Sequence, residues 1–410
     1  MTDRYAVISS DCHGGAQLLE YRDYLPSSLY DEFDAWARDY AIPFEDLRGP
    51  DADQNWSSER RLREMDDQGV AGEVIYPNTI PPFFPRGSLV GQPPAKDRKE
   101  LDLKWIGLKA HNRWLVDFVH QAPERRAGIA QIMLHDVDAA VEEVRWAKDA
   151  GLRGGVLLPG TPPGGDYEPL WSKVYEPLWQ VCEELEMPVN HHGGGGGPSY
   201  GQDDIGFVMF VLEVPWWAHR ALWALMFSGV LERHPNMQLV FSEQGTAWIP
   251  ERLTELDHFF HRMRDTSNGS QEAIWGGPVR ELSLSPSEYW ARQCHVGASF
   301  LRPSEAKKRA DVGVGRIMWG TDYPHLEGTQ PFTREALRAT FADIPEHEVR
   351  AMLGTNAAAL YGFDLAALQP LVDRIGPTVE EVAVPLDALP EGSLKCPAFD
   401  DWRKLQEAAA

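Results

Sequence analysis

The sequence has little cysteine and few basic side chains, and each shortage excludes a class of protein. Four cysteines scattered along 410 residues exclude a disulfide framework and a Cys-x-x-Cys metal site. Lysine and arginine number 39 against 62 aspartate and glutamate, which gives a formal net charge of −23. Nucleic acids and anionic membranes are bound through basic patches, so we expect no nucleic acid and no membrane among the partners.

Long hydrophobic runs are missing as well. No apolar stretch approaches the ~20 residues that span a bilayer, and the amino-terminal segment lacks the basic and apolar regions of a signal peptide. We therefore expect a cytoplasmic location. What the sequence does have is 43% hydrophobic and 25% charged residues, a composition typical of folded globular proteins.

Short apolar runs alternate along the chain with longer stretches of helical periodicity, of which the clearest are 137–150, 170–186 and 216–231. Several runs are almost continuously apolar, as in strands that helices cover on both faces. Eight such strand–helix units close into a barrel more readily than they form an open sheet, so the predicted fold class is α/β, a (β/α)8 TIM barrel. The predicted strands are 5–10, 72–76, 128–134, 154–158, 188–192, 238–242, 295–301 and 316–319.

Two long insertions and a carboxyl-terminal extension surround the predicted barrel. The barrel domain is predicted to span 1–368, with insertions of about 14–68 after the first strand and 77–110 after the second. Loops of this length are usually lids or subdomains, and both follow the carboxyl end of a strand, which is the catalytic face of a barrel. The extension 369–410 is expected to pack on the barrel or on a partner subunit, and a homodimer is the default expectation.

Candidate metal ligands follow the first and fifth strands. Asp11 and His13 lie two residues apart at a strand end, so both side chains point to the same side and can bind one metal ion. The pair alone is weak evidence, because Asp-x-His is frequent by chance. The fifth strand ends in His191 and His192, of which alternation lets only one face the barrel axis. The glycine run 193–197 then lets the backbone approach a ligand closely, or is a flexible connector.

Carboxylates follow the sixth and eighth strands. Glu243 comes directly after an apolar strand, where a buried glutamate is rare unless it is paired or bound to metal. The alternative for this residue is an ion pair with a nearby arginine such as Arg252. Asp322 also follows an apolar strand, and its alternative is to stabilise a turn, with His325 on the surface.

These separate signals indicate one place, because the carboxyl ends of the strands converge on one mouth in a closed barrel. Nitrogen and oxygen donors gathered there without cysteine are typical of a metal site. The predicted ligands are Asp11, His13, His192, Glu243 and Asp322, with His191 as the contender for the fifth-strand position.

At these positions the sequence resembles the amidohydrolase-related superfamily of metal-dependent TIM barrels, in its decarboxylase-like branch. The resemblance covers roughly residues 5–363. In that branch the fifth-strand ligand comes four residues after the proline, which implies His192. The resembling features are the Asp11/His13 pair, the histidine after Leu185-Glu186-Met187-Pro188-Val189, the turn after the sixth strand and Gly320-Thr321-Asp322-Tyr323-Pro324.

Two departures from that branch bear on the metal. Many members carry His-x-His where this chain has Asp11-Cys12-His13, and they usually place a histidine where this chain has Glu243. A histidine-rich site suits a single Zn²⁺ that activates water. A carboxylate-rich site suits iron and can hold two ions, because carboxylates bridge metals.

The insertions, the Glu-x-Gly turn and the segment from Asp322 to Gly328 resemble a narrower group, the TIM-barrel non-haem diiron monooxygenases of platensimycin/platencin-type diterpenoid biosynthesis. That resemblance implies two iron ions, O₂, an external electron donor such as a ferredoxin, and hydroxylation of a bulky apolar substrate linked to acyl-CoA. The leading hypothesis is therefore an iron-dependent monooxygenase with Glu243 and His325 as catalytic residues. Further candidates at or near the metal are His191, His325, Glu327 and His258.

Two other hypotheses stay open. The same ligands fit a mononuclear zinc or manganese hydrolase or non-oxidative decarboxylase, in which Glu243 is the general base. A binding or scaffold protein without activity is the third hypothesis, and the intact ligand set argues against it.

The sequence also offers weaker candidates for contacts with a substrate. Tryptophans in the insertions and after the fifth strand are candidate pocket walls, and arginines in the first insertion are candidate partners of CoA phosphates. A structural role for the tryptophans and a solvated charged face for the arginines are the simpler interpretations. The residues concerned are Trp56, Trp105, Trp216, Arg60, Arg61 and Arg63.

Overall fold

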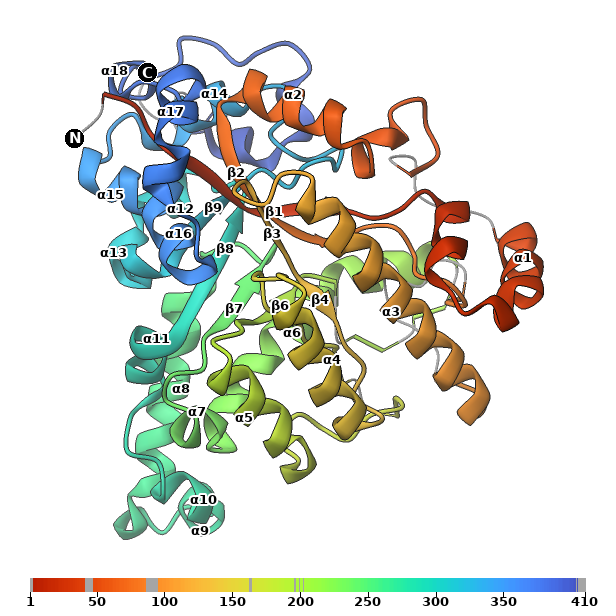
Figure 1. The fold of residues 1–410 in the computed structure, drawn as a ribbon. Coiled ribbons are helices and arrows are strands. Elements are labelled where there is room, and N and C mark those ends of the chain that lie inside the picture. Colours follow the sequence, from red (N-terminus) through yellow and green to blue (C-terminus); the bar gives the residue numbers. More distant parts are fainter. Residues whose placement is uncertain are drawn as a thin grey trace.

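The computed structural model (Figure 1) describes residues 3–40, 47–85, 95–161, 164–194, 197–198, 200–201, 203–402 and 404. All neighbouring strands in its two sheets pair in parallel, in the orders β1-β2-β3 and β4-β5-β6-β7-β8-β9. The strands are β1 (Val7–Gly14), β2 (Val70–Pro77), β3 (Arg126–Gly128), β4 (Ala130–Gln131), β5 (Val156–Leu157), β6 (Val189–His192), β7 (Leu239–Ser242), β8 (Cys294–Ser299) and β9 (Ile317–Gly320).

One barrel strand is divided in two, and its halves join the two sheets. β3 and β4 are separated only by Ile129, whose backbone N–H donates to the carbonyl of Ile75 on β2 over 3.1 Å. On the other side, the N–H of Ala130 donates to the carbonyl of Gly155 beside β5 over 2.9 Å. The hydrogen bonding therefore continues through this strand, and the two sheets form one curved wall.

The remaining seam lies between β9 and β1, where the barrel closes. The Ser10 hydroxyl donates to the carbonyl of Trp319 over 3.0 Å, and the backbone N–H of Asp322 donates to the carbonyl of Asp11 over 2.9 Å. Gly320 permits this approach, because a Cβ at that position would lie only 2.8 Å from the Cβ of Asp11. The predicted (β/α)8 barrel is confirmed, with each predicted strand at its expected place.

The outer helices form where the sequence combines a cap with an apolar stripe. In α4, Asp136 accepts a hydrogen bond from the N–H of Ala139 over 3.1 Å, and the buried positions Ala140, Val144 and Ala147 recur at helical spacing. The helices after β3 are α4 (Val137–Asp149), α5 (Glu176–Glu184), α6 (Asp204–Phe227), α7 (Val230–Arg233), α8 (Ile249–Arg264), α9 (Gln271–Trp275), α10 (Gly277–Arg280), α11 (Pro286–Gln293), α12 (Pro303–Lys307), α13 (Arg309–Val312), α14 (Thr333–Phe341), α15 (Glu346–Arg350), α16 (Asn356–Tyr361), α17 (Leu365–Ile375) and α18 (Val379–Val382).

Helix α6 differs from its prediction, which placed its start at 216. It begins at Asp204, because Asp203 caps it by accepting a hydrogen bond from the N–H of Gly206 over 2.7 Å. Pro215 lies inside the helix. The periodicity predicted the part of α6 that packs on the barrel and missed the turns before it.

Within the described residues, the predicted insertions contain the helices α1 (Tyr30–Asp39) and α2 (Ser58–Gln68) and the start of α3 (Arg98–His120). α3 begins inside the predicted second insertion and packs along β4, so it is the barrel's own helix after β2. In the predicted extension, Thr378 pairs with Arg4, and Cys396 and Phe399 pack in one cluster with Ala336 of α14. This part of the extension therefore contacts the barrel of its own chain.

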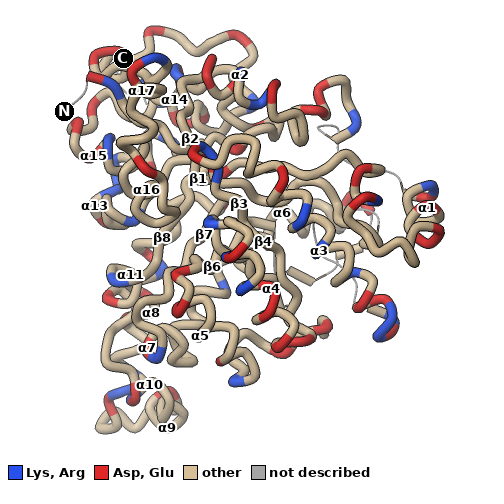
Figure 2. Tube along the Cα trace, in the orientation of Figure 1, with Lys and Arg blue, Asp and Glu red and all other residues tan. Residues whose placement is uncertain are grey.

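The described chain holds no helix that is both long and apolar enough to cross a bilayer. Acidic and basic residues are interspersed on the outer helices and the insertions rather than separated by sign (Figure 2). Most large apolar side chains lie between the strands and the helices. The barrel also holds a pair of buried hydroxyl groups, with the hydroxyl of Tyr76 2.6 Å from that of Ser242.

Candidate metal centre

Six side chains from four strand ends meet at the carboxyl-terminal mouth of the barrel. β1 and β6 carry the first three, and the loops that follow β7 and β9 carry the others. They form two groups of four in which the nearest ligand atoms all lie within 4.8 Å of one another. The first group is Asp11, His13, His192 and Glu243, and the second is His13, Glu243, Asp322 and His325.

In the first group, one carboxylate oxygen of Asp11 contacts two imidazoles. Asp11 Oδ1 lies 3.4 Å from His13 Nε2 and 3.3 Å from His192 Nε2. His192 Nε2 is also 3.1 Å from Oε2 of Glu243. Donor atoms from β1, β6 and the loop after β7 therefore surround one point, as a shared cation requires.

In the second group, Asp322 takes the place of Asp11. Its Oδ1 atom lies 3.1 Å from His13 Nε2 and 2.9 Å from Nδ1 of His325. His13 and Glu243 belong to both groups, with 4.0 Å between His13 Nε2 and Glu243 Oε2. The mouth thus offers more donor atoms than one ion needs to be held.

Backbone strain turns the two loop carboxylates into the mouth. Glu243 and Asp322 have φ angles of 53° and 59°, in the left-handed region that costs a non-glycine residue about 1–3 kcal/mol. Gly193 makes room for the first of them, because a Cβ there would lie 2.5 Å from the carbonyl oxygen of Glu243. The chain keeps this unfavourable geometry at both carboxylates, which is typical of functional sites.

In each imidazole, the ring nitrogen that faces away from the cluster lies within hydrogen-bond distance of an oxygen atom. His13 Nδ1 lies 3.3 Å from the carbonyl of Pro77, and His192 Nδ1 lies 2.9 Å from the carbonyl of Gly193. His325 Nε2 lies 3.2 Å from the side-chain oxygen of Asn78. Such contacts fix the tautomer and leave the other ring nitrogen for a metal ion.

One of the two buried aspartates at the centre lacks the hydrogen bonds that a buried charge needs. Asp11 and Asp322 are fully buried, and neither oxygen of Asp322 makes a hydrogen bond of good geometry with any described group. Two nitrogens that face Asp322, His13 Nε2 and His325 Nδ1, are likewise without a hydrogen bond among the described residues. Buried polar atoms in this state are expected where an ion completes the structure.

The titration of these groups shows how strongly they depend on one another. Burial raises the pKa of Glu243 to about 7, and the charge of Asp322 acts in the same direction. Burial opposes the charged form of His192, but Asp11 and Glu243 raise its pKa to about 9. Without a cation, protons on the imidazoles thus balance the carboxylates, and a divalent ion that binds here replaces such protons. The cluster of carboxylate and imidazole donors, with no cysteine, fits such an ion.

The structure gathers the five predicted ligands and His325, and it leaves three other candidates outside. His191 is buried with its ring 6.1 Å from that of Phe241, on the far side of the strand from His192. Glu327 is exposed on the loop beyond His325, and His258 is exposed on α8. Neither of these two belongs to either group of candidate ligands.

The alternative partners considered for the predicted residues do not hold. Arg252 pairs with Glu255 on its own helix instead of with Glu243. Arg61 is fully buried and pairs with Glu73 over 2.7 Å, so it is neither a solvated surface residue nor accessible to a phosphate.

Three residues support the cluster in roles that were not predicted from the sequence. Ser299 at the end of β8 donates a hydrogen bond to Asp11, and Asn78 just after β2 contacts His325. Arg61 donates to the carbonyl of His13. Ser299 and Asn78 stand at strand ends like the predicted ligands, so their position was the available signal. Nothing local in the sequence distinguishes Arg61 from its neighbouring arginines.

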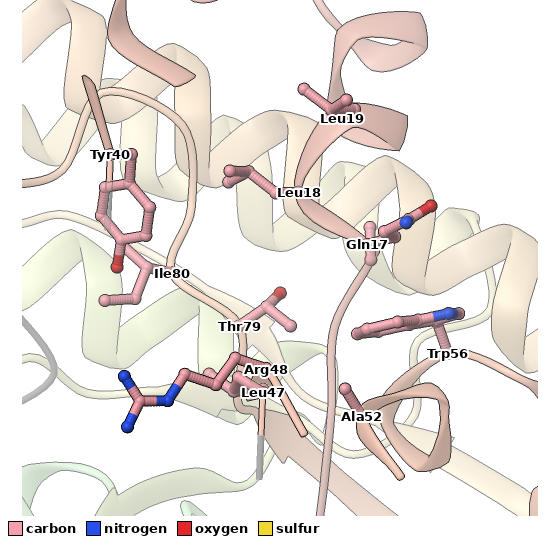
Figure 3. Close-up of a pocket in the computed structure, with 11 residues that line it drawn as sticks. Gln17, Leu18, Leu19, Tyr40, Leu47, Arg48, Ala52, Trp56, Thr79 and Ile80 are labelled. Atoms are coloured by element: carbon pink, nitrogen blue, oxygen red, sulfur yellow. The ribbon is translucent and has the colours of Figure 1, made fainter. Parts of the chain in front are cut away.

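A cavity of about 290 Å³ is lined by residues from the first insertion, which follows β1, and by Thr79 and Ile80 from the loop after β2 (Figure 3). Its wall begins at Ala16, three residues after His13 and so no more than about 11 Å along the chain from the cluster. Most of the lining is apolar, and its polar side chains are Gln17, Tyr40, Arg48 and Thr79. Trp56 is one of its walls, whereas Trp105 and Trp216 are not among the lining residues.

Comparison with known proteins places this geometry in a family. The family model described as amidohydrolase matches residues 33–363. A gamma-resorcylate decarboxylase of Rhodococcus jostii is 26% identical over 273 residues, which cover 62% of this chain and 75% of the relative. A 2-amino-3-carboxymuconate-6-semialdehyde decarboxylase of Dictyostelium discoideum is 23% identical over 317 residues, 75% of this chain and 77% of the relative.

Solved structures share the fold. The 5-carboxyvanillate decarboxylase of Novosphingobium aromaticivorans, crystallised with manganese and 3-methoxy-4-hydroxy-5-nitrobenzoic acid, has a TM-score of 0.66 and 18% identity. The match covers 88% of this chain and 98% of that one.

These findings correct the leading hypothesis from the sequence. The two relatives and the solved structure named above are decarboxylases and not diiron monooxygenases, so the prediction of an iron-dependent monooxygenase is wrong. Iron, oxidoreductase chemistry and an acyl-CoA substrate are not supported, whereas the alternative of a zinc or manganese decarboxylase agrees with the findings. The error has a physical reason, because carboxylate and imidazole ligands suit several divalent ions and do not by themselves select the reaction.

Proposed function

The chain belongs to the amidohydrolase family, and we propose that it is a non-oxidative decarboxylase that depends on Mn²⁺ or Zn²⁺. Its substrate is a small aromatic or otherwise unsaturated carboxylic acid. The observation that carries the proposal is the convergence of six donor side chains on a buried mouth, with Asp322 left without a hydrogen bond among the described residues. The decarboxylases among its relatives support the choice of reaction.

The ion would be held by side chains from four strand ends. In the proposed arrangement its charge, when bound, anchors and polarises the carboxylate end of the substrate. The mixed donors suit manganese, zinc and iron alike, and manganese is favoured because solved structures of similar fold contain it. The proposed ligands are Asp11, His13, His192, Glu243 and Asp322, with His325 next to them.

The reaction needs a proton at the carbon that loses CO₂. The bond between that carbon and the carboxylate breaks, its electron pair stays on the carbon, and a proton takes the position that CO₂ leaves. We assign this proton to the Asp322–His325 pair, whose atoms Oδ1 and Nδ1 are 2.9 Å apart. The His325 side chain is 19% exposed, so the proton can be replaced from solvent after each turnover.

The cavity beside the cluster suits the organic part of such a substrate. At about 290 Å³ it exceeds the ~150 Å³ cavity that accommodates benzene, so one substituted ring fits. The face of Trp56 and the side chain of Leu18 offer apolar contacts, and Gln17 and Thr79 offer hydrogen bonds to ring substituents. The proposed substrate lies with its ring in this cavity and its carboxylate toward the mouth.

The test is a balance of products under nitrogen. The full chain loaded with Mn²⁺ is incubated with hydroxybenzoic and unsaturated dicarboxylic acids, and CO₂ release is measured against substrate loss. We expect one CO₂ per substrate consumed without O₂. Turnover that requires O₂ and a reductant, or hydrolysis of an amide or ester without CO₂, would overturn the proposal.

A further inference from the structure

Two buried asparagines connect the first insertion to His325 at the barrel mouth. Asn55 ends the short 3-10 helix η4 (Ala52–Asn55) in the first insertion, and Asn78 follows β2. Asn55 has no exposed surface, and Asn78 is 3% exposed. Three hydrogen bonds run in series from the carbonyl of Ala52 through both side-chain amides to Nε2 of His325, over 3.0, 2.5 and 3.2 Å. We call this series the asparagine relay.

The direction of each hydrogen bond in the asparagine relay follows from its first member. A backbone carbonyl can only accept, so the atom of Asn55 beside Ala52 is the NH₂ group. The oxygen of Asn55 then faces Asn78, which must offer its own NH₂ group. The oxygen of Asn78 remains for His325, and it can only accept a hydrogen bond from an Nε2 that carries a proton.

The opposite direction is unfavourable. Turning the amide of Asn78 would place its oxygen 2.5 Å from the oxygen of Asn55. Turning both amides would place an oxygen of Asn55 against the carbonyl of Ala52. Two buried acceptors that face each other have no proton to share, so each such pair loses a hydrogen bond and repels. The backbone carbonyl of Ala52 therefore determines which nitrogen of His325 carries a proton.

The backbones of both asparagines are tied to the end of β1. The N–H of Asn78 donates to the carbonyl of Gly14 over 2.9 Å, and the carbonyl of Asn55 accepts from the N–H of Gly15 over 3.3 Å. These bonds hold the two amides at a fixed place beside the mouth. The asparagine relay is thus anchored to the same strand that carries Asp11.

We propose that Asn55 and Asn78 are positioning residues that keep a proton on Nε2 of His325 and leave Nδ1 as the nitrogen that serves the mouth. Nδ1 lies 2.9 Å from Oδ1 of Asp322, and the ring stacks on that of His13 with 4.0 Å between the centroids. The effect on the reaction rate rests on the proposed function, in which Asp322 and His325 supply the proton. The position of the proton on the ring does not.

The helix that begins the asparagine relay is also a wall of the cavity. Ala52 and Trp56, which follows Asn55 directly, both line the cavity (Figure 3). A substrate ring held against this wall therefore contacts the segment that orients His325. The first insertion in this way joins the placement of the substrate to the orientation of the group that protonates it.

The proposal is tested by heteronuclear NMR of the full chain, labelled on histidine and loaded with Zn²⁺, which is diamagnetic. The signals of His325 are identified by their loss in His325→Gln. In the wild type we expect a hydrogen-bonded proton on Nε2. In Asn78→Leu this proton should lose its downfield shift and exchange faster with water, and Asn78→Asp, which keeps an acceptor oxygen, should restore it. A wild type without a proton on Nε2, or unchanged signals in Asn78→Leu, would overturn the proposal.

Kinetics separates the asparagine relay from two independent contacts. In Asn55→Leu and Asn78→Leu we expect kcat for CO₂ release to fall roughly 10–100-fold with KM unchanged. The double variant should fall no further than Asn78→Leu, because Asn55 acts only through Asn78. Losses that multiply in the double variant would overturn this series. An absence of CO₂ release from the wild type would count against the proposed function alone, since the NMR result does not depend on turnover.

Asn112 provides a matched control. It is fully buried, and its side chain forms hydrogen bonds of 2.9 and 2.8 Å with the carbonyl and the N–H of Gln131 on β4. Asn112→Leu removes the same kind of buried amide outside the asparagine relay. We expect it to lower the Tm without changing kcat or the Nε2 proton of His325. Equal changes in Asn112→Leu and Asn78→Leu would assign the effect to the loss of a buried amide in general and would overturn the proposal.

Discussion

The barrel mouth and the amino-terminal half of α6 depart from the usual distribution of side chains in opposite ways. At the mouth, Asp11 and Asp322 are charged groups with no exposure to water. On α6, Phe207 and Leu212 are large apolar groups that are two-thirds exposed. Both are unusual, because buried charges are normally paired and large apolar patches are normally covered.

Each of the two regions lacks a binding partner, and the two partners differ in chemistry. Carboxylates packed against imidazoles with unmet hydrogen bonds lack a cation, whereas an exposed apolar helical face lacks another apolar surface. The largest effects on activity are expected from substitutions at the mouth, because the proposed reaction takes place there.

The largest effect is expected at Asp322. Asp322→Asn removes a buried ligand charge and the partner of the proton on His325, so decarboxylation should fall by roughly 10²–10⁴-fold and bound Mn²⁺ should decrease. Rates of CO₂ release and metal analysis measure both. Glu327→Gln, an exposed acidic residue on the same loop, is the matched control and should change neither. Equal losses in the two variants would contradict the assignment.

The next effect separates two neighbouring histidines. His192→Gln removes a donor that lies 3.3 Å from Asp11 and 3.1 Å from Glu243, and we expect Mn²⁺ affinity to fall at least roughly 100-fold. His191→Gln makes the same substitution at the neighbouring residue, whose ring faces Phe241. The affinity of this variant for Mn²⁺ should therefore stay as in the wild type. Calorimetric titration of the two variants tests this, and the opposite ranking would place the ligand at His191.

Removing the metal ion tests how much an ion bound at the mouth contributes to the free energy of unfolding. An ion at about 1,000 times its dissociation constant contributes about 4 kcal/mol, and at about 2 °C per kcal/mol for a chain of this size a chelator should lower the Tm by roughly 8 °C. Scanning calorimetry with and without EDTA measures the shift. Asp322→Asn should show little of it, and a full shift in that variant would assign the effect to another site.

The smallest effect is expected on α6, whose exposed apolar side chains the homodimer expected from the sequence would cover. Because mass action links pairing to stability, the Tm of the wild type should fall by roughly 2 °C on tenfold dilution. Leu212→Glu should remove this dependence on concentration and leave Mn²⁺ affinity unchanged. A wild-type Tm that does not depend on protein concentration would contradict pairing through α6.

Much of the barrel could be predicted because a buried strand shows itself as a short run of apolar residues in the sequence. Runs such as 239–241 are apolar on both faces, and barrel closure brings the residues at the ends of these strands to the mouth. Asp11, His192 and Glu243 follow from this rule. Their roles as ligands stay a prediction, since position at a strand end does not by itself make a side chain bind an ion.

What could not be predicted depends on contacts between distant segments. The start of α6 at Asp204 was missed because its first turns are apolar on nearly every side and show no helical stripe. Asn78 and Ser299 gain their roles from His325 and Asp11, which no local pattern links to them. The reaction itself was misjudged because one ligand set serves several chemistries.

The central claim, that the mouth is completed by a divalent cation, is tested most directly by anomalous diffraction at the manganese edge from crystals grown with Mn²⁺. We expect a peak within about 2.0–2.6 Å of donor atoms in the cluster. The residues expected around it are Asp11, His13, His192, Glu243 and Asp322. No anomalous peak among these residues, with their carboxylates paired to arginine or lysine instead, would contradict the account.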